Sequence, residues 1–375
     1  MKKKVLIVFG TRPEAIKMAP IVKSFKQEDT LFETIVCVTA QHRQMLDQVL
    51  DFFEIRPDYD LDLMKPNQSL TSITSDIIYG LNSVLENVKP DYVFVHGDTT
   101  TSFAAALAAF YNHSKVCHIE AGLRTHNKLS PYPEEMNRQL TARLADFHFA
   151  PTKSSETNLL KENIIPENIL VTGNTVIDAL LYSSKKVENY RSDEIRSLEN
   201  LVKTNKRILL VTGHRRENHG EGFQRICAAL KTLAASINDI EIIYPVHLNP
   251  NVVGPVFNIL SGIANVHLIE PLSYPTFVWL MSKSYVILTD SGGVQEEAPS
   301  LGKPVLVMRD TTERPEAVKA GTVILVGTNC DSIVSKTEEL FNDRSYYDKM
   351  AKAHNPYGDG NAASRVVNYI KNLNF

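Results

Sequence analysis

The segments KVLIVFGTRPE at residues 4–14 and RILLVTGHRRE at residues 207–217 decide the fold. Each begins with a basic residue, continues with four aliphatic residues and ends in the pattern G-x-R-x-E. A short apolar run that leads into a glycine turn is typical of the first strand of a parallel α/β domain, because helices cover such strands on both faces. The repetition therefore predicts two similar α/β domains in one chain.

The length of the chain agrees with this division. It has 375 residues, more than one ordinary hydrophobic core contains and enough for two domains. Further strand-like runs occur at residues 34–38, 92–95, 116–119, 147–150, 240–244, 266–269, 285–288 and 305–308. Because helix-like stretches separate these runs, we expect two Rossmann-like, doubly wound domains at residues 1–172 and 173–359. Open sheets of this kind bind ligands at the carboxyl ends of their strands, so the expected site is a central cleft that the two domains face.

Composition excludes several classes of protein. Lys and Arg total 40 and Asp and Glu total 43, for a net charge of −3, so nothing favours nucleic-acid or membrane-surface binding. The four cysteines form no CxxC pair, and we expect free thiols in a reducing cytosol rather than disulfides or zinc. No apolar run is long enough for a signal peptide or a membrane span, which predicts a soluble cytoplasmic protein.

Two glycine loops are candidate phosphate sites. Gly10 and Arg12 follow the first strand, where a helix N-terminus favours an anion, although a plain turn with a solvated Arg is the alternative. The run Asp290-Ser291-Gly292-Gly293 follows another buried strand, and its amides could cradle a phosphate, or Asp290 or Ser291 could simply cap a helix. A carboxylate later in that helix suits a ribose hydroxyl better than a phosphate. The chain has no GxGxxG and no GxxxxGK[ST], which disfavours NAD chemistry.

Acidic and histidine residues follow the other predicted strands. Asp98, Glu120 and Glu134 are expected on one rim of the first sheet, and clustered carboxylates should raise the pKa of at least one of them into the range of a proton donor. Each could instead be a capping or surface acid. His214 and His247 follow strands of the second domain, where they could contact a diphosphate, transfer a proton or only hydrogen-bond within their loops. The sequence supports no metal site.

The motifs of the chain, in order, resemble those of the non-hydrolysing UDP-N-acetylglucosamine 2-epimerase family from end to end. They are GTRPEAIKMAP from Gly10, TAQHRQML from Thr39, VHGDTT from Val95, EAGLRT from Glu120, PEEMNR from Pro133, TGHRREN from Thr212, YPVHLNPNV from Tyr244, TDSGGVQEEAPSLGKPVLVMRDTTERPE from Thr289 and HNPYGDG from His354. The resemblance implies two Rossmann-like domains of the glycosyltransferase-B type, with the last helix, residues 360–375, packing back on the first domain.

The resemblance also implies an activity and a set of residues. The family interconverts UDP-GlcNAc and UDP-ManNAc without NAD or metal, supplies ManNAc for surface polysaccharides, forms homodimers and is often activated by its own substrate. The implied catalytic residues are Asp98, Glu120, Glu134 and His214. Those implied for binding UDP and sugar are Arg12, Lys17, Arg138, Phe277, Ser291, Gly292, Gly293, Glu297 and Arg314, with Arg309 nearby. The implied regulatory site comprises Gln41, Gln44, Arg215 and His247.

The chemistry of C2 inversion fits both lines of reasoning. Loss of UDP from C1 acidifies the neighbouring C2–H, so a carboxylate can remove that proton and leave 2-acetamidoglucal with UDP still bound. Protonation from the opposite face and return of UDP complete the inversion. A hydrolysing epimerase that releases free ManNAc, a sugar transferase of the same fold and a non-enzymatic nucleotide-sugar sensor remain the alternatives.

Overall fold

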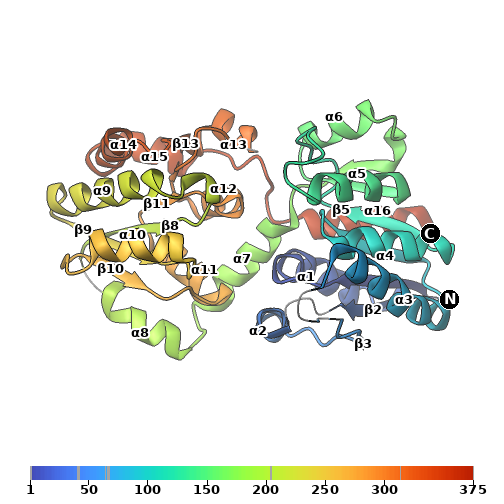
Figure 1. Cartoon of the computed structure of the whole chain (residues 1–375). Coiled ribbons are helices and arrows are strands. Elements are labelled where there is room, and N and C mark those ends of the chain that lie inside the picture. Colours follow the sequence, from blue (N-terminus) through green and yellow to red (C-terminus); the bar gives the residue numbers. More distant parts are fainter. Residues whose placement is uncertain are drawn as a thin grey trace. The chain divides into compact units, whose positions relative to one another are not determined.

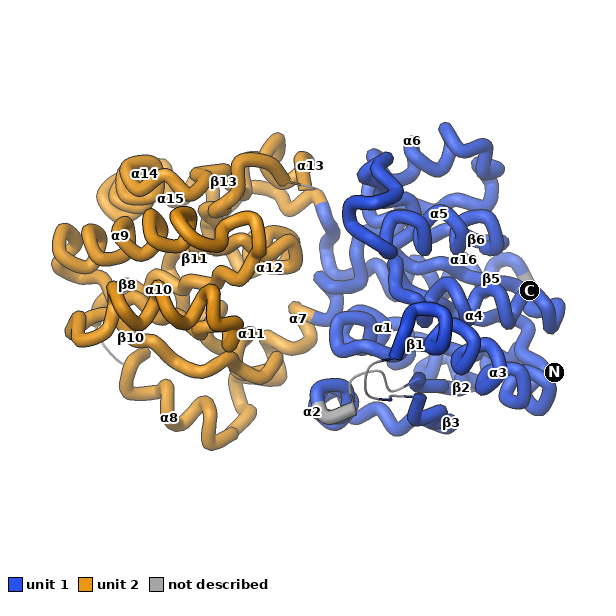
Figure 2. Tube along the Cα trace, viewed as in Figure 1, with its two compact units in different colours: residues 1–179, 357–375 blue, residues 180–356 orange. Residues whose placement is uncertain are grey.

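The structure is a computed structural model that describes residues 2–39, 43–63, 65, 68–202, 205–312 and 314–374, without the side chains of residues 43, 44 and 374. The chain divides into two compact units, each built on a parallel sheet (Figures 1 and 2). Unit 1 contains residues 1–179 and 357–375, and unit 2 contains residues 180–356. The predicted class of two doubly wound α/β domains is confirmed.

The strands of unit 1 are β1 (Lys3–Phe9), β2 (Phe32–Val38), β3 (Tyr59–Asp60), β4 (Tyr92–His96), β5 (Lys115–Ile119), β6 (Phe147–Ala150) and β7 (Ile169–Val171). Its helices are α1 (Arg12–Gln27), α2 (Arg43–Phe53), α3 (Leu70–Val88), α4 (Thr100–Tyr111), α5 (Glu134–Leu144), α6 (Lys153–Lys161), η1 (Pro166–Asn168) and α16 (Ala362–Asn374). Helix α7 (Thr175–Val187) runs from unit 1 into unit 2.

The strands of unit 2 are β8 (Arg207–Thr212), β9 (Ile240–Pro245), β10 (Val266–Ile269), β11 (Val286–Thr289), β12 (Val305–Val307) and β13 (Val323–Leu325). Its helices are α8 (Asp193–Val202), η2 (Arg216–Asn218), α9 (Glu221–Ser236), α10 (Pro250–Leu260), α11 (Tyr274–Lys283), α12 (Gly292–Glu297), η3 (Ala298–Leu301), α13 (Pro315–Ala320), α14 (Cys330–Asn342) and α15 (Arg344–Ala351). No helix among the described residues is long and apolar enough to cross a lipid bilayer.

Both sheets reverse their strand order beside the first strand. The order in unit 1 is β3-β2-β1-β4-β5-β6-β7, and the order in unit 2 is β10-β9-β8-β11-β12-β13. The chain therefore builds one side of each sheet first and then returns to the other side, at β1/β4 in unit 1 and at β8/β11 in unit 2. Such a switch point leaves a crevice at the carboxyl ends of the two central strands, which is where open α/β sheets bind ligands.

The core of unit 1 follows the alternation of side chains along its strands. Leu6 and Val8 of β1 pack with buried residues of α3 and α4 on one face of the sheet. On the other face, Phe25 of α1 contacts Phe32 and Phe94 edge to face, with ring centroids 5.1 Å apart in each pair. Because both faces are covered, the central strands are apolar throughout, which is why the sequence revealed them as uninterrupted runs.

The end of the chain completes unit 1. The ring of Tyr369 in α16 packs edge to face against Phe147 and Phe149 of β6, with centroids 5.8 and 5.6 Å away. The carboxylate of Asp178 in α7 accepts the first amides of α16, and Lys371 of α16 pairs with Glu28 at 3.1 Å. These contacts attach the returning chain to the first sheet.

Candidate active site

Four of the predicted site residues lie in or beside the loops that follow the central strands. In unit 1, Arg12 follows β1 and Asp98 follows β4. In unit 2, His214 follows β8 and Ser291 follows β11. These four loops occupy the two switch points, so the sheet topology of each unit independently agrees with the placement of the candidates.

Glu120 is the most enclosed of the candidate acids. It follows β5 directly, is buried, and has a left-handed backbone with φ of 60°, which is uncommon for a residue other than glycine. Its Oε2 accepts hydrogen bonds from Nζ of Lys17 and from Nδ2 of Asn174, the second at 2.9 Å. Its Oε1 accepts from Nη2 of Arg138 at 3.0 Å, and Nε2 of His96 lies 3.7 Å from Oε2. Side chains from α1, α5, β4 and the start of α7 thus fix one carboxylate.

The charges around Glu120 fix its protonation state. Burial acts to raise the pKa of the Glu120 carboxyl, but Lys17, His96 and Arg138 outweigh it and hold this pKa well below its usual range. The sequence predicted that clustered acids would raise the pKa of at least one of them; Glu120 is not that acid, because two cations lie against its carboxylate. Glu120 is therefore ionised at neutral pH.

Arg138 links Glu120 to Asp98. Its Nη2 lies 2.7 Å from Oδ2 of Asp98 and 3.0 Å from Oε1 of Glu120, and its Nη1 donates to the backbone oxygen of Glu120 at 2.7 Å. The neighbouring Asn137 donates from Nδ2 to the backbone oxygen of Asp98 at 2.9 Å. Two predicted catalytic acids are thus brought together by one guanidinium, and Asp98 remains partly exposed to a substrate.

Glu134 and Arg12 lie at the starts of helices. Glu134 is the first residue of α5, one turn before Arg138, and is half-buried. Among the described residues it forms no hydrogen bond or ion pair with Asp98 or Glu120. Arg12 is the first residue of α1 and is half-buried. The first turn of α5 therefore positions Glu134 on the same helix as Arg138, without direct contact with the other two acids.

Glu14 is a residue whose role the sequence reasoning missed. Its Oε2 accepts the amides of Gly10 at 3.0 Å and Thr11 at 2.8 Å, while Oε1 accepts the hydroxyl of Thr99 at 2.6 Å. It thereby ties the loop after β1 to the loop after β4, which carries Asp98. The pattern T-x-x-E at residues 11–14 is a capping box, and it was the signal that could have found this role.

In unit 2 a buried carboxylate connects the two central loops in a similar way. Oδ2 of Asp290 accepts the backbone amides of His214 and Arg215 at 2.9 and 2.8 Å, and Nδ2 of Asn218 at 3.3 Å. Its Oδ1 faces Nδ1 of His214 at 3.5 Å. Asp290 therefore acts as a cross-link between the loops after β8 and β11, and its carboxylate orients the imidazole of His214.

His214 stacks on His247, with ring centroids 5.4 Å apart. Burial lowers the pKa of the His214 imidazole, aided by His247 and Arg215, while the carboxylate of Asp290 acts in the opposite direction. His247 is exposed and accepts the amide of Asn249 through Nδ1 at 3.1 Å. The two predicted histidines thus come together in unit 2, with His214 favouring the neutral form.

The Ser291 loop is built for close approach rather than for capping. Ser291 occupies the N-cap position of α12, but its side chain forms no capping hydrogen bond. A Cβ added at Gly292 would lie 3.6 Å from the guanidinium of Arg314 and 3.8 Å from that of Arg215, and one at Gly293 would lie 3.6 Å from Oε2 of Glu297. The loop therefore offers amides and a hydroxyl between two guanidinium groups, as a phosphate site requires.

The remaining predicted residues are less closely connected. Phe277 lies on α11 with a partly exposed ring. Gln41 lies outside the described residues, and Gln44 lies in α2 with a side chain that is not described. No group of three or more His, Cys, Asp or Glu side chains suited to a metal ion occurs in the described part of the chain.

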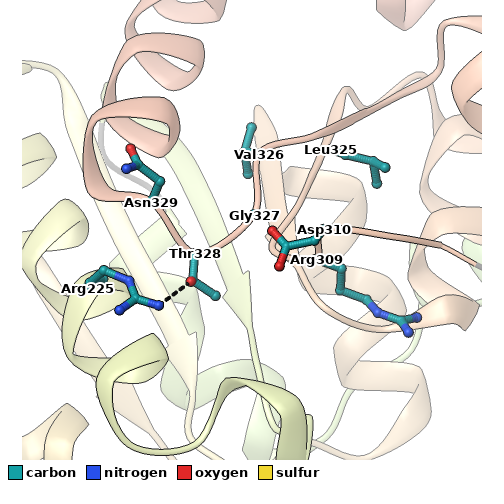
Figure 3. A pocket seen from close by; sticks show the side chains of 8 residues that line it. All are labelled: Arg225, Arg309, Asp310, Leu325, Val326, Gly327, Thr328 and Asn329. Atoms are coloured by element: carbon teal, nitrogen blue, oxygen red, sulfur yellow. Dashed lines mark hydrogen bonds between the residues drawn. The ribbon is translucent and has the colours of Figure 1, made fainter.

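A separate cavity in unit 2, of about 510 Å³, contains Arg309 (Figure 3). Arg225 donates to Thr328 across its floor at 2.9 Å, as the figure shows. Arg309 donates from Nε to Oε1 of Glu217 at 2.6 Å, so its charge is balanced there. The expectation that Arg309 lies near bound UDP stays a prediction.

The chain is similar to several known proteins over nearly its whole length. Residues 25–371 match the family model described as UDP-N-acetylglucosamine 2-epimerase. A UDP-N-acetylglucosamine 2-epimerase of Yersinia pestis is 59% identical over 375 residues, 98% of each chain. The crystal structure of UDP-GlcNAc 2-epimerase from Neisseria meningitidis bound to UDP-GlcNAc is 55% identical, covers 98% of this chain and 100% of its own, and has a TM-score of 0.87. The Methanocaldococcus jannaschii enzyme in complex with UDP-GlcNAc and UDP is 34% identical, covers 98% and 99%, and has a TM-score of 0.79.

Proposed function

The chain belongs to the UDP-N-acetylglucosamine 2-epimerase family, and we propose that it inverts C2 of UDP-GlcNAc to give UDP-ManNAc, reversibly and without net hydrolysis. The observation that carries this proposal is the cluster of Asp98, Arg138, Glu120 and Lys17 beside the switch point of unit 1. It supplies carboxyl groups next to fixed cations, as the removal and return of a proton on a sugar require.

The first step of the proposed reaction breaks the C1–O bond and releases UDP from the sugar. We assign the diphosphate to the Ser291–Gly293 loop, where amides and the guanidinium group of Arg314 balance the charge that forms on UDP. Glu297 suits the ribose hydroxyls and the half-exposed Phe277 suits the uracil ring. His214, held by Asp290, is assigned a proton or hydrogen bond to the departing phosphate oxygen.

The second step moves the proton at C2. Loss of UDP leaves positive charge at C1, which acidifies the C2–H bond, and a carboxylate removes that proton to give 2-acetamidoglucal. Glu120 is assigned to accept it, because its neighbours keep it ionised and fixed in place. Asp98 and Glu134 are the groups available to return a proton on the opposite face, after which UDP adds back to C1. Arg12 and Lys17 are assigned to the substrate in this half of the reaction. The route needs no nicotinamide and no metal.

Proton NMR of the purified protein with UDP-GlcNAc in D2O tests the proposal. The expected result is a mixture of the two UDP-sugars, with deuterium at C2 of the product and no accumulation of free ManNAc. Free ManNAc and UDP in substantial yield would identify a hydrolysing epimerase instead. Turnover only after addition of a sugar acceptor would identify a transferase, and retention of protium at C2 would exclude exchange at that carbon.

Regulation by the substrate is part of the proposal. Two of the implied regulatory residues lie beside His214. Arg215 is next to Gly292, and His247 stacks on the imidazole of His214. A second molecule of UDP-GlcNAc bound there, with Gln41 and Gln44, would act directly on the groups that hold the leaving phosphate. The expected behaviour is a rate that rises sigmoidally with UDP-GlcNAc, and Arg215→Ala should remove the sigmoidal shape.

We further propose a homodimer that works in the cytoplasm. Three large aromatic side chains, Tyr79 of α3 and Phe110 and Tyr111 of α4, are 82%, 57% and 62% exposed on neighbouring helices. An exposed aromatic group of this kind is typical of a protein interface. All four cysteines are free, as expected in a reducing compartment. Sedimentation of the wild type and of Phe110→Glu tests the dimer.

A further inference from the structure

Asn174 lies between the last strand of unit 1 and helix α7, and it is almost fully buried. Three of its polar groups connect it to different parts of unit 1. The backbone amide donates to the oxygen of Tyr357 at 2.6 Å, and Oδ1 accepts the amide of Val176 at 3.1 Å. The side-chain Nδ2 donates to Oε2 of Glu120 at 2.9 Å. One residue is therefore bonded to the start of α7, to the returning chain and to a candidate catalytic carboxylate.

Asn174 lies close to the point where the chain passes from unit 1 to unit 2. The chain leaves unit 1 after residue 179 and re-enters it at residue 357. The bond from Asn174 to Tyr357 joins the outgoing and returning segments within unit 1. A Cβ added at Gly173 would lie 3.3 Å from both the oxygen of Tyr357 and Cα of Gly358, so the two segments have little room to separate.

We propose that Asn174 is a positioning residue for the epimerisation, which holds the carboxylate of Glu120 in a fixed relation to the two segments that connect the units. The proposal rests on the proposed function and goes beyond it, because Asn174 belongs to none of the motif residues assigned to the reaction. It touches Glu120 rather than the substrate, so its effect is expected on the rate of the chemical step and not on the binding of UDP.

The surroundings of Glu120 explain why a neutral amide matters there. The charged and titratable groups that face Glu120 are Lys17 from α1, His96 from β4, Arg138 from α5 and, through Arg138, Asp98. Arg138 fixes Oε1, whereas Oε2 is shared by the flexible Lys17 and by Asn174. Without the amide, the position of Oε2 would follow the lysine. A displacement of about 1 Å in a reacting group costs roughly 10²-fold in rate.

A purely structural role for Asn174 makes a different prediction. Its Oδ1 caps the start of α7, and Asp and Ser cap helices about as well as Asn. Asn174→Asp therefore keeps the cap but replaces the donor to Glu120 with a second carboxylate oxygen. Asn174→Ser keeps a cap and has a hydroxyl too short to reach Glu120. Both variants separate capping from positioning, and the serine variant remains informative if the buried aspartate impairs folding.

The experiment measures kcat of epimerisation against pH, the affinity for UDP and thermal unfolding. We expect Asn174→Asp and Asn174→Ser to lower kcat by about 10²-fold, with UDP affinity unchanged within twofold. In Asn174→Asp the acid limb of the kcat profile should move up by about one pH unit, because a second carboxylate favours protonation of Glu120. The matched control is Asp178→Asn, since Asp178 anchors α16 through the amides of Ala362 and Ala363. It should lower the unfolding temperature and leave the pH profile unchanged.

Each outcome decides between positioning and structure. Wild-type kcat and an unmoved acid limb in both Asn174 variants would overturn the inference while leaving the proposed function intact. The inference would also be overturned if Asn174→Ser and Asp178→Asn showed the same loss of kcat for the same loss of thermal stability. A wild-type protein that does not epimerise UDP-GlcNAc refutes the proposed function itself, and that result is obtained before any variant is made.

Discussion

The two G-x-R-x-E segments, at residues 10–14 and 213–217, have the same sequence pattern but different hydrogen bonds. They differ in which carboxylate accepts the backbone amides of the glycine loop. In unit 1 the motif's own Glu14 is buried and accepts the two amides of its glycine loop, and it also reaches the loop after β4. In unit 2 the corresponding Glu217 is exposed and pairs with Arg309. The two loop amides there are held by Asp290, which comes from the loop after β11.

Both units therefore place one buried carboxylate across the switch point, but the carboxylate comes from opposite sides of it. The difference leaves different groups available to a ligand. In unit 1 the loop after β4 is left with its acid, Asp98, partly exposed. In unit 2 the acid of the loop after β11, Asp290, forms the cross-link. That loop therefore offers a ligand the Ser291 hydroxyl and the glycine amides instead. The first arrangement suits proton transfer and the second suits an anion.

The largest expected effect tests the assignment of proton transfer to unit 1. Asp98→Asn should lower turnover by about 10³-fold, because a lost acid or base typically costs 10²–10⁴-fold. UDP affinity, measured by calorimetry, should stay within a factor of three. Asp91→Asn is the matched control, since Asp91 lies at the opposite end of the same strand, where it pairs with Lys3. Equal loss of turnover in Asp98→Asn and Asp91→Asn would contradict the assignment of proton transfer to the loop after β4.

The next effect concerns stability in acid. Burial lowers the pKa of His96 and of His148 to about 4, from an ordinary 6.5, and also lowers the pKa of His118. The unfolded chain therefore binds these protons first, so the stabilisation is complete above pH 6.5 and is lost as the pH falls toward 4. His96 and His148 each contribute of order 3 kcal/mol.

All three histidines lie in strands of unit 1, so this unit should open first in acid. Hydrogen exchange between pH 7 and pH 5 measures the opening of each sheet separately. His148→Gln should reduce the pH dependence in unit 1, whereas the exposed His113, changed to Asn, should leave it unaltered. Faster loss of protection in unit 2 than in unit 1 would argue against this account.

The smallest effect separates the two cross-links themselves. Oε2 of Glu14 accepts two backbone amides and Oε1 accepts the hydroxyl of Thr99. In Glu14→Gln the NH2 group would face that hydroxyl, which must then turn to another acceptor, and the change should cost about 2 kcal/mol of stability. In Asp290 only Oδ2 accepts amides, and Oδ1 faces an imidazole nitrogen that can accept. Asp290→Asn should therefore cost less than about 1 kcal/mol.

Thermal unfolding and UDP calorimetry of both variants check this difference. The amide at residue 290 would fix Nδ1 of His214 as an acceptor, so UDP affinity should change in Asp290→Asn and not in Glu14→Gln. If Asp290→Asn destabilises the protein more than Glu14→Gln does, the proposed difference between the hydrogen bonds of the two carboxylates is wrong.

The sequence predicted the fold well where apolar runs were long. The central strands of both sheets are buried on both faces, so their periodicity was unambiguous. The strands β7 and β13 have three residues each and are only partly buried, and no signal in the sequence distinguished them from loops. The place of the last helix on unit 1 was implied only by the family resemblance, since the contact of Tyr369 with Phe147 depends on the fold.

The site was predictable as a set of residue types at strand ends, and much less as a network. Asp98 and Glu120 were expected on one rim from their positions after β4 and β5. That Lys17 and Arg138 would lie against Glu120 and lower its pKa depends on contacts across 103 and 18 residues of sequence. Such contacts follow from how helices pack on the sheet, and a motif read along the chain does not contain that information.

The left-handed backbone of Glu120 is tolerated because of what its side chain contacts. A φ of 60° costs an ordinary residue about 1 kcal/mol or more, and glycine adopts it freely. Glycine at this position would, however, leave Lys17 and Arg138 without their buried partner, and breaking a buried ion pair costs roughly 3–5 kcal/mol. A library screened for heat resistance alone would therefore keep the carboxylate that the proposed reaction uses.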